Sequence, residues 1–309
     1  MYPASFEYHR TLSVPEALAL LELYGDEAKV LAGGHSLIPV MKLRFASPAH
    51  LVDIARIPGL AGITDGETTI HIGAATRHAD LVSSAVVQAK APLLSEAAAH
   101  IGDPLIRNMG TIGGSLAHAD PGADLPAVML ALGATMVVTG KGGQRTITAD
   151  DFFPDVFTSA LQQGELLTEI RVPVQGAGNG GAYEKYPDPA SGYAIVGIAV
   201  QLTLTAGVIT AARVGMTGLG PKATRLLAVE SALAGQGANS ATVDAAAARA
   251  ADGIVFIDDS RGSAAYKANL ARVHVRRAIT RAITRAIARA VVYQPQRAGM
   301  DCPSQGPGA

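Results

Sequence analysis

The sequence is poor in cysteine, tryptophan and charge. Cys302 is the only cysteine among 309 residues, and there is no tryptophan. A single thiol cannot close an internal disulfide, form a cysteine-based structural zinc site or hold an iron–sulfur cluster, so none of these is expected within the chain. One cysteine in a chain of this length also favours a cytoplasmic location.

Charge and hydropathy patterns argue against a nucleic-acid-binding surface and against a transmembrane segment. Charged residues make up 17% of the chain and the net charge is -1, which argues against a nucleic-acid-binding surface. The N-terminus lacks the pattern of a signal peptide. The uncharged segment Pro189–Ala212 alternates polar residues with leucines near its centre. This period of two predicts a half-buried strand, so no transmembrane segment is expected.

Apolar residues and glycine are abundant. Hydrophobic residues make up 49% of the chain and there are 34 glycines, which predicts a globular protein of two domains or lobes with many tight turns. In the first half, strand patterns at 6–10, 29–33 and 50–54 flank a helix that Ser13 and Glu16 start as a capping box.

The Gly-rich segment 174–181 is the best candidate for a domain boundary. Three strand-like runs and two helices follow it, which predicts an antiparallel sheet backed by helices and an α+β class. We therefore predict domains at 1–175 and 176–292, and a disordered tail at 293–309.

The stretch from Arg272 to Arg297, most of which is a predicted C-terminal helix, contains seven arginines and no acidic residue. Such a helix could bind a membrane surface, a nucleic acid or a partner subunit. The favoured interpretation is a packed helix with Ile279, Ile283 and Ile287 facing inward and the arginines facing outward.

Two diglycine stretches are the main candidates for ligand binding. Gly33-Gly34-His35-Ser36 follows a predicted strand, and Thr111 precedes Gly113-Gly114-Ser115 within 106–126, which is predicted to be one long loop. Glycine permits positive φ and close approach of the backbone, and successive N–H groups can bind a pyrophosphate. Either stretch could equally be an ordinary turn, because neither fits the dinucleotide fingerprint or the P-loop. The eight histidines show no metal-binding spacing.

Several separated motifs together resemble one family. "LAGGHSLIPVMKLR", "IRNMGTIGGSLAHADPGADLP", "GELLTEIRVP" and "AYEKY" occur in the order found in the medium, FAD-binding subunit of molybdenum hydroxylases. The nearest likeness is to the carbon monoxide dehydrogenase medium subunits, and the xanthine dehydrogenase flavin domain is more distant. The segment "YPDPASGYAIVG" departs from the basic, Asp-containing stretch of many relatives, so the likeness does not imply carbon monoxide as the substrate.

The resemblance implies a two-lobed FAD-binding domain of the vanillyl-alcohol-oxidase (PCMH) type and a small C-terminal α+β domain, with non-covalent FAD between the lobes. The two glycine stretches would hold the pyrophosphate and ribityl region. Asp124 would accept hydrogen bonds from the sugar-like hydroxyls, Lys185 would lie near the flavin, and Tyr193 would cover one face of its ring. The full set implied is Ala32, Gly33, Gly34, His35, Ser36, Leu37, Ile101, Thr111, Ile112, Gly113, Gly114, Ser115, Asp124, Leu167, Lys185 and Tyr193.

The assignments of Asp124, Lys185 and Tyr193 each have a structural alternative. Asp124 can simply cap the following helix, Lys185 can be a solvated strand residue, and Tyr193 can belong to the core.

The resemblance also implies partners and a role. A small subunit with two [2Fe–2S] clusters and a large molybdopterin subunit would join this chain as a dimer of heterotrimers. Electrons from the clusters would pass through FAD to an external acceptor. Two alternatives stay open: a self-contained flavin oxidase with FAD attached covalently at His35, and a flavin-free assembly protein of the same fold.

Overall fold

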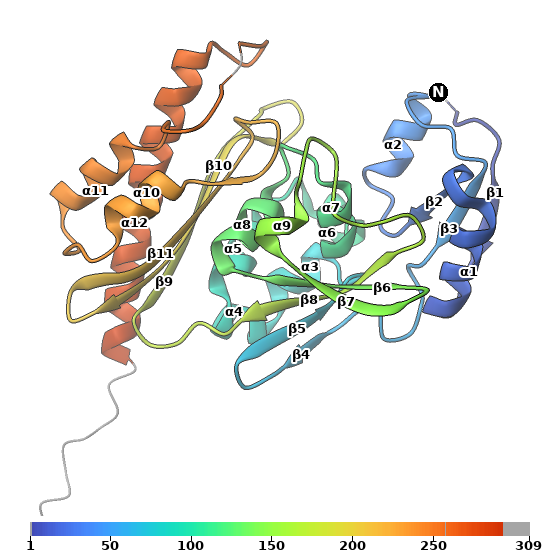
Figure 1. The fold of residues 1–309 in the computed structure, drawn as a ribbon, viewed down its shortest axis with the longest axis horizontal. Coiled ribbons are helices and arrows are strands. Elements are labelled where there is room, and N and C mark those ends of the chain that lie inside the picture. Colours follow the sequence, from blue (N-terminus) through green and yellow to red (C-terminus); the bar gives the residue numbers. More distant parts are fainter. Residues whose placement is uncertain (1, 257, 293–309) are drawn as a thin grey trace, which may run out of the picture.

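The computed structural model describes residues 2–256 and 258–292, and it contains three separate β-sheets with helices between and around them (Figure 1). The predicted tail at 293–309, with Cys302, lies outside the described residues. No helix in the described part of the chain combines the length and apolar character needed to cross a bilayer.

The N-terminal lobe is a small parallel sheet of order β1-β3-β2. Its helix α1 begins after Ser13, whose hydroxyl accepts from the Glu16 N–H, and it ends at Gly25 as expected for this glycine. A short helix connects β2 to β3. The elements are β1 (Glu7–Arg10), α1 (Val14–Tyr24), the 3₁₀ turn η1 (Gly25–Glu27), β2 (Ala28–Leu31), α2 (Leu37–Lys42) and β3 (His50–Asp53).

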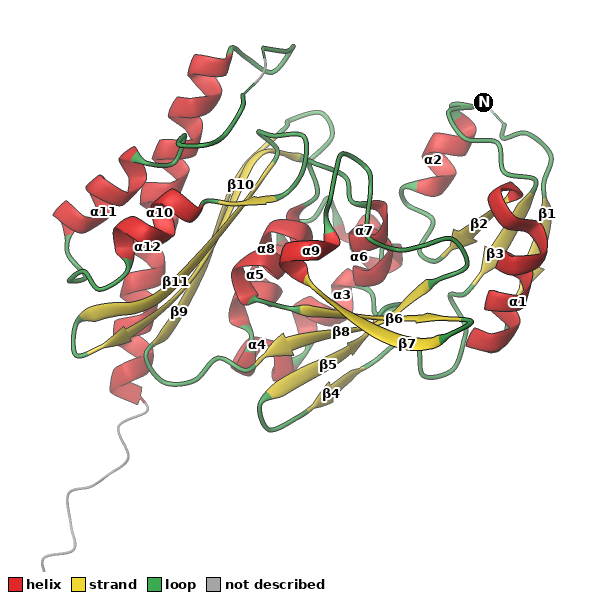
Figure 2. Cartoon of the chain, viewed as in Figure 1, coloured by secondary structure: helices red, strands yellow, loops and turns green. Residues whose placement is uncertain are grey.

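The second lobe is a five-stranded antiparallel sheet of order β4-β5-β8-β6-β7, packed against a group of short helices (Figure 2). Its strands are β4 (Ile63–Asp65), β5 (Thr69–Gly73), β6 (Thr135–Gly140), β7 (Gly143–Thr148) and β8 (Leu166–Pro173). Its helices are α3 (His78–Ser83), α4 (Ala85–Lys90), α5 (Pro92–Ala99), α6 (Pro104–Met109), α7 (Ile112–His118), α8 (Asp124–Leu132) and α9 (Ala149–Phe152).

The C-terminal part is a four-stranded antiparallel sheet of order β12-β11-β10-β9 with helices on its outer face. This is the antiparallel sheet backed by helices that the sequence predicts. Its elements are β9 (Asn179–Pro187), β10 (Ala194–Thr205), β11 (Val208–Thr217), β12 (Thr224–Arg225), α10 (Leu227–Leu233), α11 (Ser240–Ala248) and α12 (Ala264–Val292).

Helices cover both faces of this last sheet. Helix α12 packs on β9 and β10, while α8 of the second lobe packs on β10 and β11. Glycine permits both contacts: a Cβ at Gly180 would lie 2.0 Å from the Ala282 carbonyl oxygen, and one at Gly215 would lie 2.1 Å from that of Ala127. The C-terminal sheet is therefore joined closely to the helices that form the cavity described below.

Two sequence predictions are wrong in detail. The stretch 106–126, predicted to be a loop, is largely helical: it contains α6 and then α7, which Thr111 caps. The glycines within α7 lower its helix propensity, so the sequence did not indicate a helix there. In α12, Ile279 and Ile283 are buried as expected, but Ile287 is 53% exposed. The arginines of α12 do not all face solvent, since Arg281 and Arg285 bind Glu96 of α5.

Candidate cofactor-binding site

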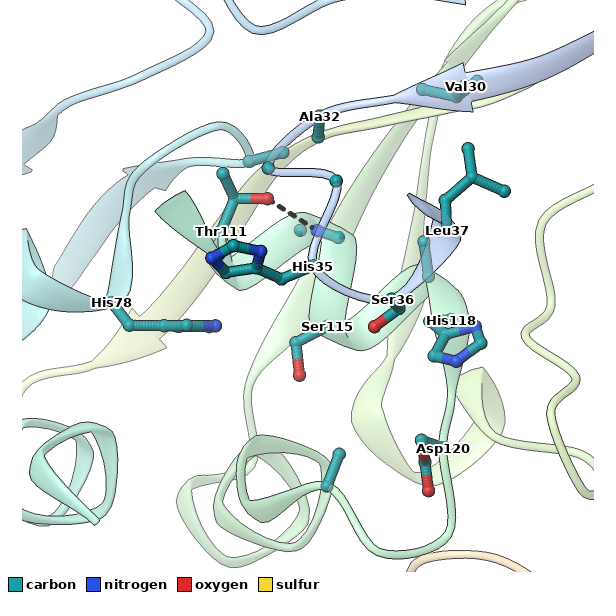
Figure 3. Close-up of a pocket in the computed structure, with 18 of the residues that line it drawn as sticks. Val30, Ala32, His35, Ser36, Leu37, His78, Thr111, Ser115, His118 and Asp120 are labelled. Carbon is teal, nitrogen blue, oxygen red and sulfur yellow. Dashed lines mark hydrogen bonds between the residues drawn. The ribbon is translucent and has the colours of Figure 1, made fainter. Parts of the chain in front are cut away.

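A cavity of about 570 Å³ lies between the N-terminal lobe and the second lobe, and the hairpin that joins β9 to β10 reaches its rim. Figure 3 shows His35 and His78 toward one end of it and His118 and Asp120 toward the other. Residues far apart in the sequence meet here, as a site for an extended ligand requires. The predicted residues that line it are Ala32, Gly33, Gly34, His35, Ser36, Leu37, Ile101, Thr111, Gly113, Gly114, Ser115, Asp124, Leu167 and Tyr193.

The first glycine stretch is the loop between β2 and α2. Gly34 has φ +75°, a conformation that favours glycine. Gly33 has a different role, because a Cβ there would lie 2.1 Å from the Met109 carbonyl oxygen. The two glycine stretches are therefore neighbours in space, and Gly33 allows the first loop to lie against the end of α6.

This first loop presents unpaired backbone donors. Within the described residues, the N–H groups of residues 33 to 36 donate to no other group of the chain. They lie on the wall of the cavity, beside the side chain of Ser36. Successive free N–H groups on a glycine-rich loop form a concave site for an anion. The loop thus has the donors that a pyrophosphate needs.

The second glycine stretch is arranged differently. Its N–H groups are used within the chain: Ile112 donates to the Thr76 carbonyl, Gly113 to the Ala74 carbonyl and Gly114 to Thr111 Oγ1 (dashed in Figure 3). A Cβ at Gly113 would lie 2.5 Å from that of Ala74. This stretch therefore packs α7 closely against the β5 end. It offers the cavity the Ser115 side chain rather than backbone donors.

Ile112 and Lys185 are the two predicted residues that do not line the cavity. Ile112 is fully buried in the core of the second lobe. The Lys185 side chain is 2% exposed, and its ammonium donates to Asp124 Oδ2 and to the His100 carbonyl, each at 2.9 Å. The structural alternative of a solvated lysine is therefore wrong.

Asp124 is the point where the cavity wall meets the C-terminal domain. It is the first residue of α8, but its carboxylate does not cap that helix. Tyr183 donates to Oδ1 at 2.5 Å, and Lys185 donates to Oδ2. Tyr183 and Lys185 both lie on β9, two residues apart, so one face of that strand holds the carboxylate. The helix-cap alternative is wrong because Ala123, not Asp124, holds the N-cap position of α8, and no side chain makes a cap hydrogen bond there.

Burial dominates the electrostatics of this group. Desolvation raises the pKa of Asp124, while Lys185 and the Tyr183 hydroxyl act to lower it. Desolvation, followed by the charge of Asp124, raises the pKa of Tyr183 well above its usual range, so the phenol stays a donor. Each carboxylate oxygen keeps an acceptor position besides the one already used. Asp124 can therefore still accept from a hydroxyl in the cavity.

Three further predicted residues line other parts of the wall. Leu167 is a buried residue of β8, and Ile101 is a partly buried residue that follows α5. Tyr193 belongs to the turn between β9 and β10, where its carbonyl accepts from the Asp188 N–H at 2.8 Å. Tyr193 is 38% exposed, and its ring packs beside Gly122. Burial, and then the negative charge of Asp120, raises the pKa of its hydroxyl.

Several residues of the cavity are absent from the sequence prediction. His78 begins α3, is 4% exposed and lies beside Gly110. Burial, then the positive fields of His35 and Arg107, lowers the pKa of His78 to about 4, so its ring is neutral at pH 7. A lone histidine carries no sequence signal for such a position. Further lining residues absent from the prediction include Gly110, His118, Asp120, Phe157, Leu161, Leu166 and Ser191.

The comparison with known families agrees along the chain. Residues 4–175 match the FAD binding domain in molybdopterin dehydrogenase. Residues 181–282 match the CO dehydrogenase flavoprotein C-terminal domain.

Individual relatives span almost the whole chain. The carbon monoxide dehydrogenase medium chain of Hydrogenophaga pseudoflava is 46% identical over 90% of this chain and 97% of its own length. A 6-hydroxypseudooxynicotine dehydrogenase complex subunit alpha from Paenarthrobacter nicotinovorans is 42% identical over 90% of this chain and 95% of its own. The relatives thus share the whole architecture and differ in the substrate that their names give.

Solved structures agree. Carbon monoxide dehydrogenase from Hydrogenophaga pseudoflava aligns with a TM-score of 0.90 and 47% identity, covering 92% of this chain and 99% of that one. Quinoline 2-oxidoreductase from Pseudomonas putida 86 aligns with a TM-score of 0.86 and 30% identity, covering 94% and 100%. The fold is therefore the two-domain fold of these flavoproteins.

Proposed function

The chain belongs to the family of FAD-binding medium subunits of molybdenum hydroxylases, which includes the carbon monoxide dehydrogenase medium chains, and we propose from this membership that it passes electrons through a non-covalently held FAD. The observation that carries the proposal is the row of unpaired N–H groups at residues 33 to 36 on the cavity wall. The proposal divides the chain into domains at 1–175 and 176–292, a division that the two family matches support.

The residues of the cavity fit FAD. A dinucleotide carries a pyrophosphate between two polyhydroxylated parts, so it needs anion donors and hydroxyl acceptors in one elongated site. The loop at 33–36 supplies backbone donors, Ser115 supplies a hydroxyl, and Asp124 supplies the acceptor. Ile101 and Leu167 provide apolar contacts, and the Tyr193 ring can cover a flat ring system at the rim.

Lys185 takes a supporting role in this proposal. Its ammonium lies behind Asp124 and not on the cavity wall, so it fixes the carboxylate and neutralises part of its charge. Lys185 would therefore act on FAD indirectly, through Asp124, and not from the position near the flavin that the family resemblance implies. Asp124 then stays in place to bind hydroxyl groups without carrying an uncompensated charge into a buried site.

When bound, FAD supplies the ability to exchange electrons one or two at a time. This chain contains no iron–sulfur cluster ligands of its own, since Cys302 is its only cysteine. We therefore assign the [2Fe–2S] clusters and the molybdopterin to a small and a large partner subunit. The three would form a dimer of heterotrimers in the cytoplasm, with an external acceptor receiving the electrons.

The test is to purify the chain with its partners and measure FAD after acid precipitation. Wild-type protein should release stoichiometric FAD into the supernatant. Replacing Ser36 and Ser115 together with alanine should lower the FAD content, while Ser83→Ala should not. Ser83 is the matched control because its hydroxyl binds the Ala79 carbonyl in α3, outside the cavity.

Three outcomes would contradict parts of the proposal. Yellow colour retained in the precipitate would indicate covalent attachment, with His35 as the nearest candidate. A complex without flavin, even after reconstitution with FAD, would indicate an assembly protein. Partner subunits that lack iron, sulfide and molybdenum would refute the electron-transfer role separately from FAD binding.

A further inference from the structure

Two histidines and a glutamate meet on one face of the N-terminal sheet. Parallel pairing places Glu7 of β1 opposite His50 of β3, so their side chains share a face, and His9 returns to that face two residues later. His9 Nε2 lies 3.0 Å from His50 Nδ1. Glu7 Oε2 lies 3.5 Å from His50 Nδ1 and 3.8 Å from His9 Nε2. Three potential ligand atoms therefore form a small triangle.

The triangle has the dimensions of a metal-binding face. Ligand atoms at about 2.05 Å from a tetrahedral zinc ion lie about 3.4 Å from one another. The three separations here, 3.0, 3.5 and 3.8 Å, all lie within about half an ångström of that value. Small side-chain rotations would equalise them. The chemistry also fits, because two imidazoles and a carboxylate are an ordinary set of zinc ligands.

Neighbouring groups hold the two imidazole rings in place. Tyr24, the last residue of α1, stacks on His50 with ring centroids 3.6 Å apart and planes 13° apart. It also stacks on His9 at 5.1 Å. The side chains of His9 and His50 are 21% and 13% exposed, whereas that of Glu7 is 72% exposed. The site is therefore ordered on its inner side and open to solvent on its outer side.

We propose that Glu7, His9 and His50 bind a divalent transition-metal ion of the zinc type, with water at the fourth position. Without metal, a proton shared between the two ring nitrogens holds them together, and the ion replaces that proton. None of the three residues lines the cofactor cavity. Lys29 and Val30 of β2 line the cavity, but Ala28, the residue of β2 that pairs with His50, does not. The ion would tie β1 to β3 and would not take part in electron transfer.

The test is a calorimetric titration of the untagged full-length chain with Zn²⁺ after removal of bound metal. A Cys302→Ser background removes the only thiol. We expect one high-affinity ion per chain in this background. Glu7→Gln, His9→Gln and His50→Gln should each weaken it by more than about tenfold, which is the loss that even an outer-shell partner of a metal ligand can cause. Co²⁺ should give the intense visible absorption of a tetrahedral site.

His71→Gln is the matched control. His71 Nδ1 also lies 3.0 Å from a glutamate, Glu169 Oε1, but the pair is not part of a three-ligand group in the described residues. This variant should keep full Zn²⁺ affinity, and the FAD content should be the same in every variant. Glu7 is exposed, so Glu7→Gln tests the site even if a histidine variant folds poorly. Absence of Zn²⁺ binding in the background, or binding that is unchanged by Glu7→Gln and His9→Gln, would overturn the proposal.

Discussion

Lys185 Nζ lies 2.9 Å from Asp124 Oδ2, and this contact joins the C-terminal sheet to the wall of the cofactor cavity. Both side chains are almost fully buried, at 2% and 6% exposed. Burying two charges is costly unless each is paired and hydrogen-bonded. Here the Tyr183 hydroxyl donates to the carboxylate, and the His100 carbonyl accepts from the ammonium. The position of Asp124, which is predicted to bind FAD, therefore depends on the packing between the two domains.

Removing one member of this pair should be worse than removing both. Lys185→Met leaves a buried carboxylate without its cation and should lower the free energy of unfolding by about 3–5 kcal/mol. The double variant Asp124→Asn with Lys185→Met should recover part of that loss. Urea unfolding of the flavin-free chains measures both. Equal stability of the single and double variants would contradict this expected recovery, and the single variant Asp124→Asn completes the cycle that gives the coupling energy.

A second link between the domains should contribute strongly because it is partly buried. Glu96 of α5 accepts from Arg281 and from Arg285 of α12, with Arg285 Nη1 at 2.5 Å. Burial acts to raise the pKa of Glu96, but the two arginines outweigh it and lower the pKa. Glu96→Gln should lower the free energy of unfolding by about 1.5–3 kcal/mol at pH 7.

The sign of the pH dependence follows from that lowered pKa. The contribution of Glu96 is present above its unfolded-state pKa and is lost as the pH falls through the folded-state pKa. The difference between wild type and Glu96→Gln should therefore shrink in acid. Arg276→Met on the same helix is the control, because its ion pair with Asp244 is exposed. A loss as large as that of Glu96→Gln in this control would contradict the role of burial.

His78 should make the free energy of unfolding depend on pH in a higher range than Glu96 does. Its pKa is lowered to about 4 from the usual 6.5 because the buried ring is poorly solvated when charged. Folding therefore gains from His78 at pH above 6.5, and that gain is lost as the pH falls from 6.5 toward 4, by about 3 kcal/mol in total. His78→Gln should flatten this part of the curve of unfolding free energy against pH. An unchanged curve would refute the prediction.

Gly33→Ala should affect folding as well as FAD binding. Its Cβ would lie 2.1 Å from the Met109 carbonyl oxygen, so the two glycine stretches would be forced apart, at a cost of about 1–3 kcal/mol. FAD content should fall at the same time, because the unpaired N–H groups would move. Thermal unfolding of the flavin-free chain separates the two effects. Gly142→Ala is the control, since a Cβ there meets no atom within 4 Å.

Much of the fold could be predicted from the sequence. The capping box at Ser13 and Glu16 and the alternation of polar residues with leucines within 189–212 each predict an element that the structure contains. These signals are local, because they depend on hydrogen bonds and periodicities within one element. Helix α7 was missed since glycine lowers helix propensity, and its packing against Ala74 overrides that preference.

The motif order in the sequence also indicated the family, and it predicted a cofactor loop at residues 32–37, because that loop is continuous in the chain. Only the tertiary structure decided what each part of the site offers. It separated the unpaired N–H groups of residues 33–36 from the paired ones of 112–114, and it placed Lys185 behind Asp124. Donor pairing and burial depend on neighbours that are distant in the sequence. Long-range packing brings β9, α8 and the two glycine stretches together around one cavity.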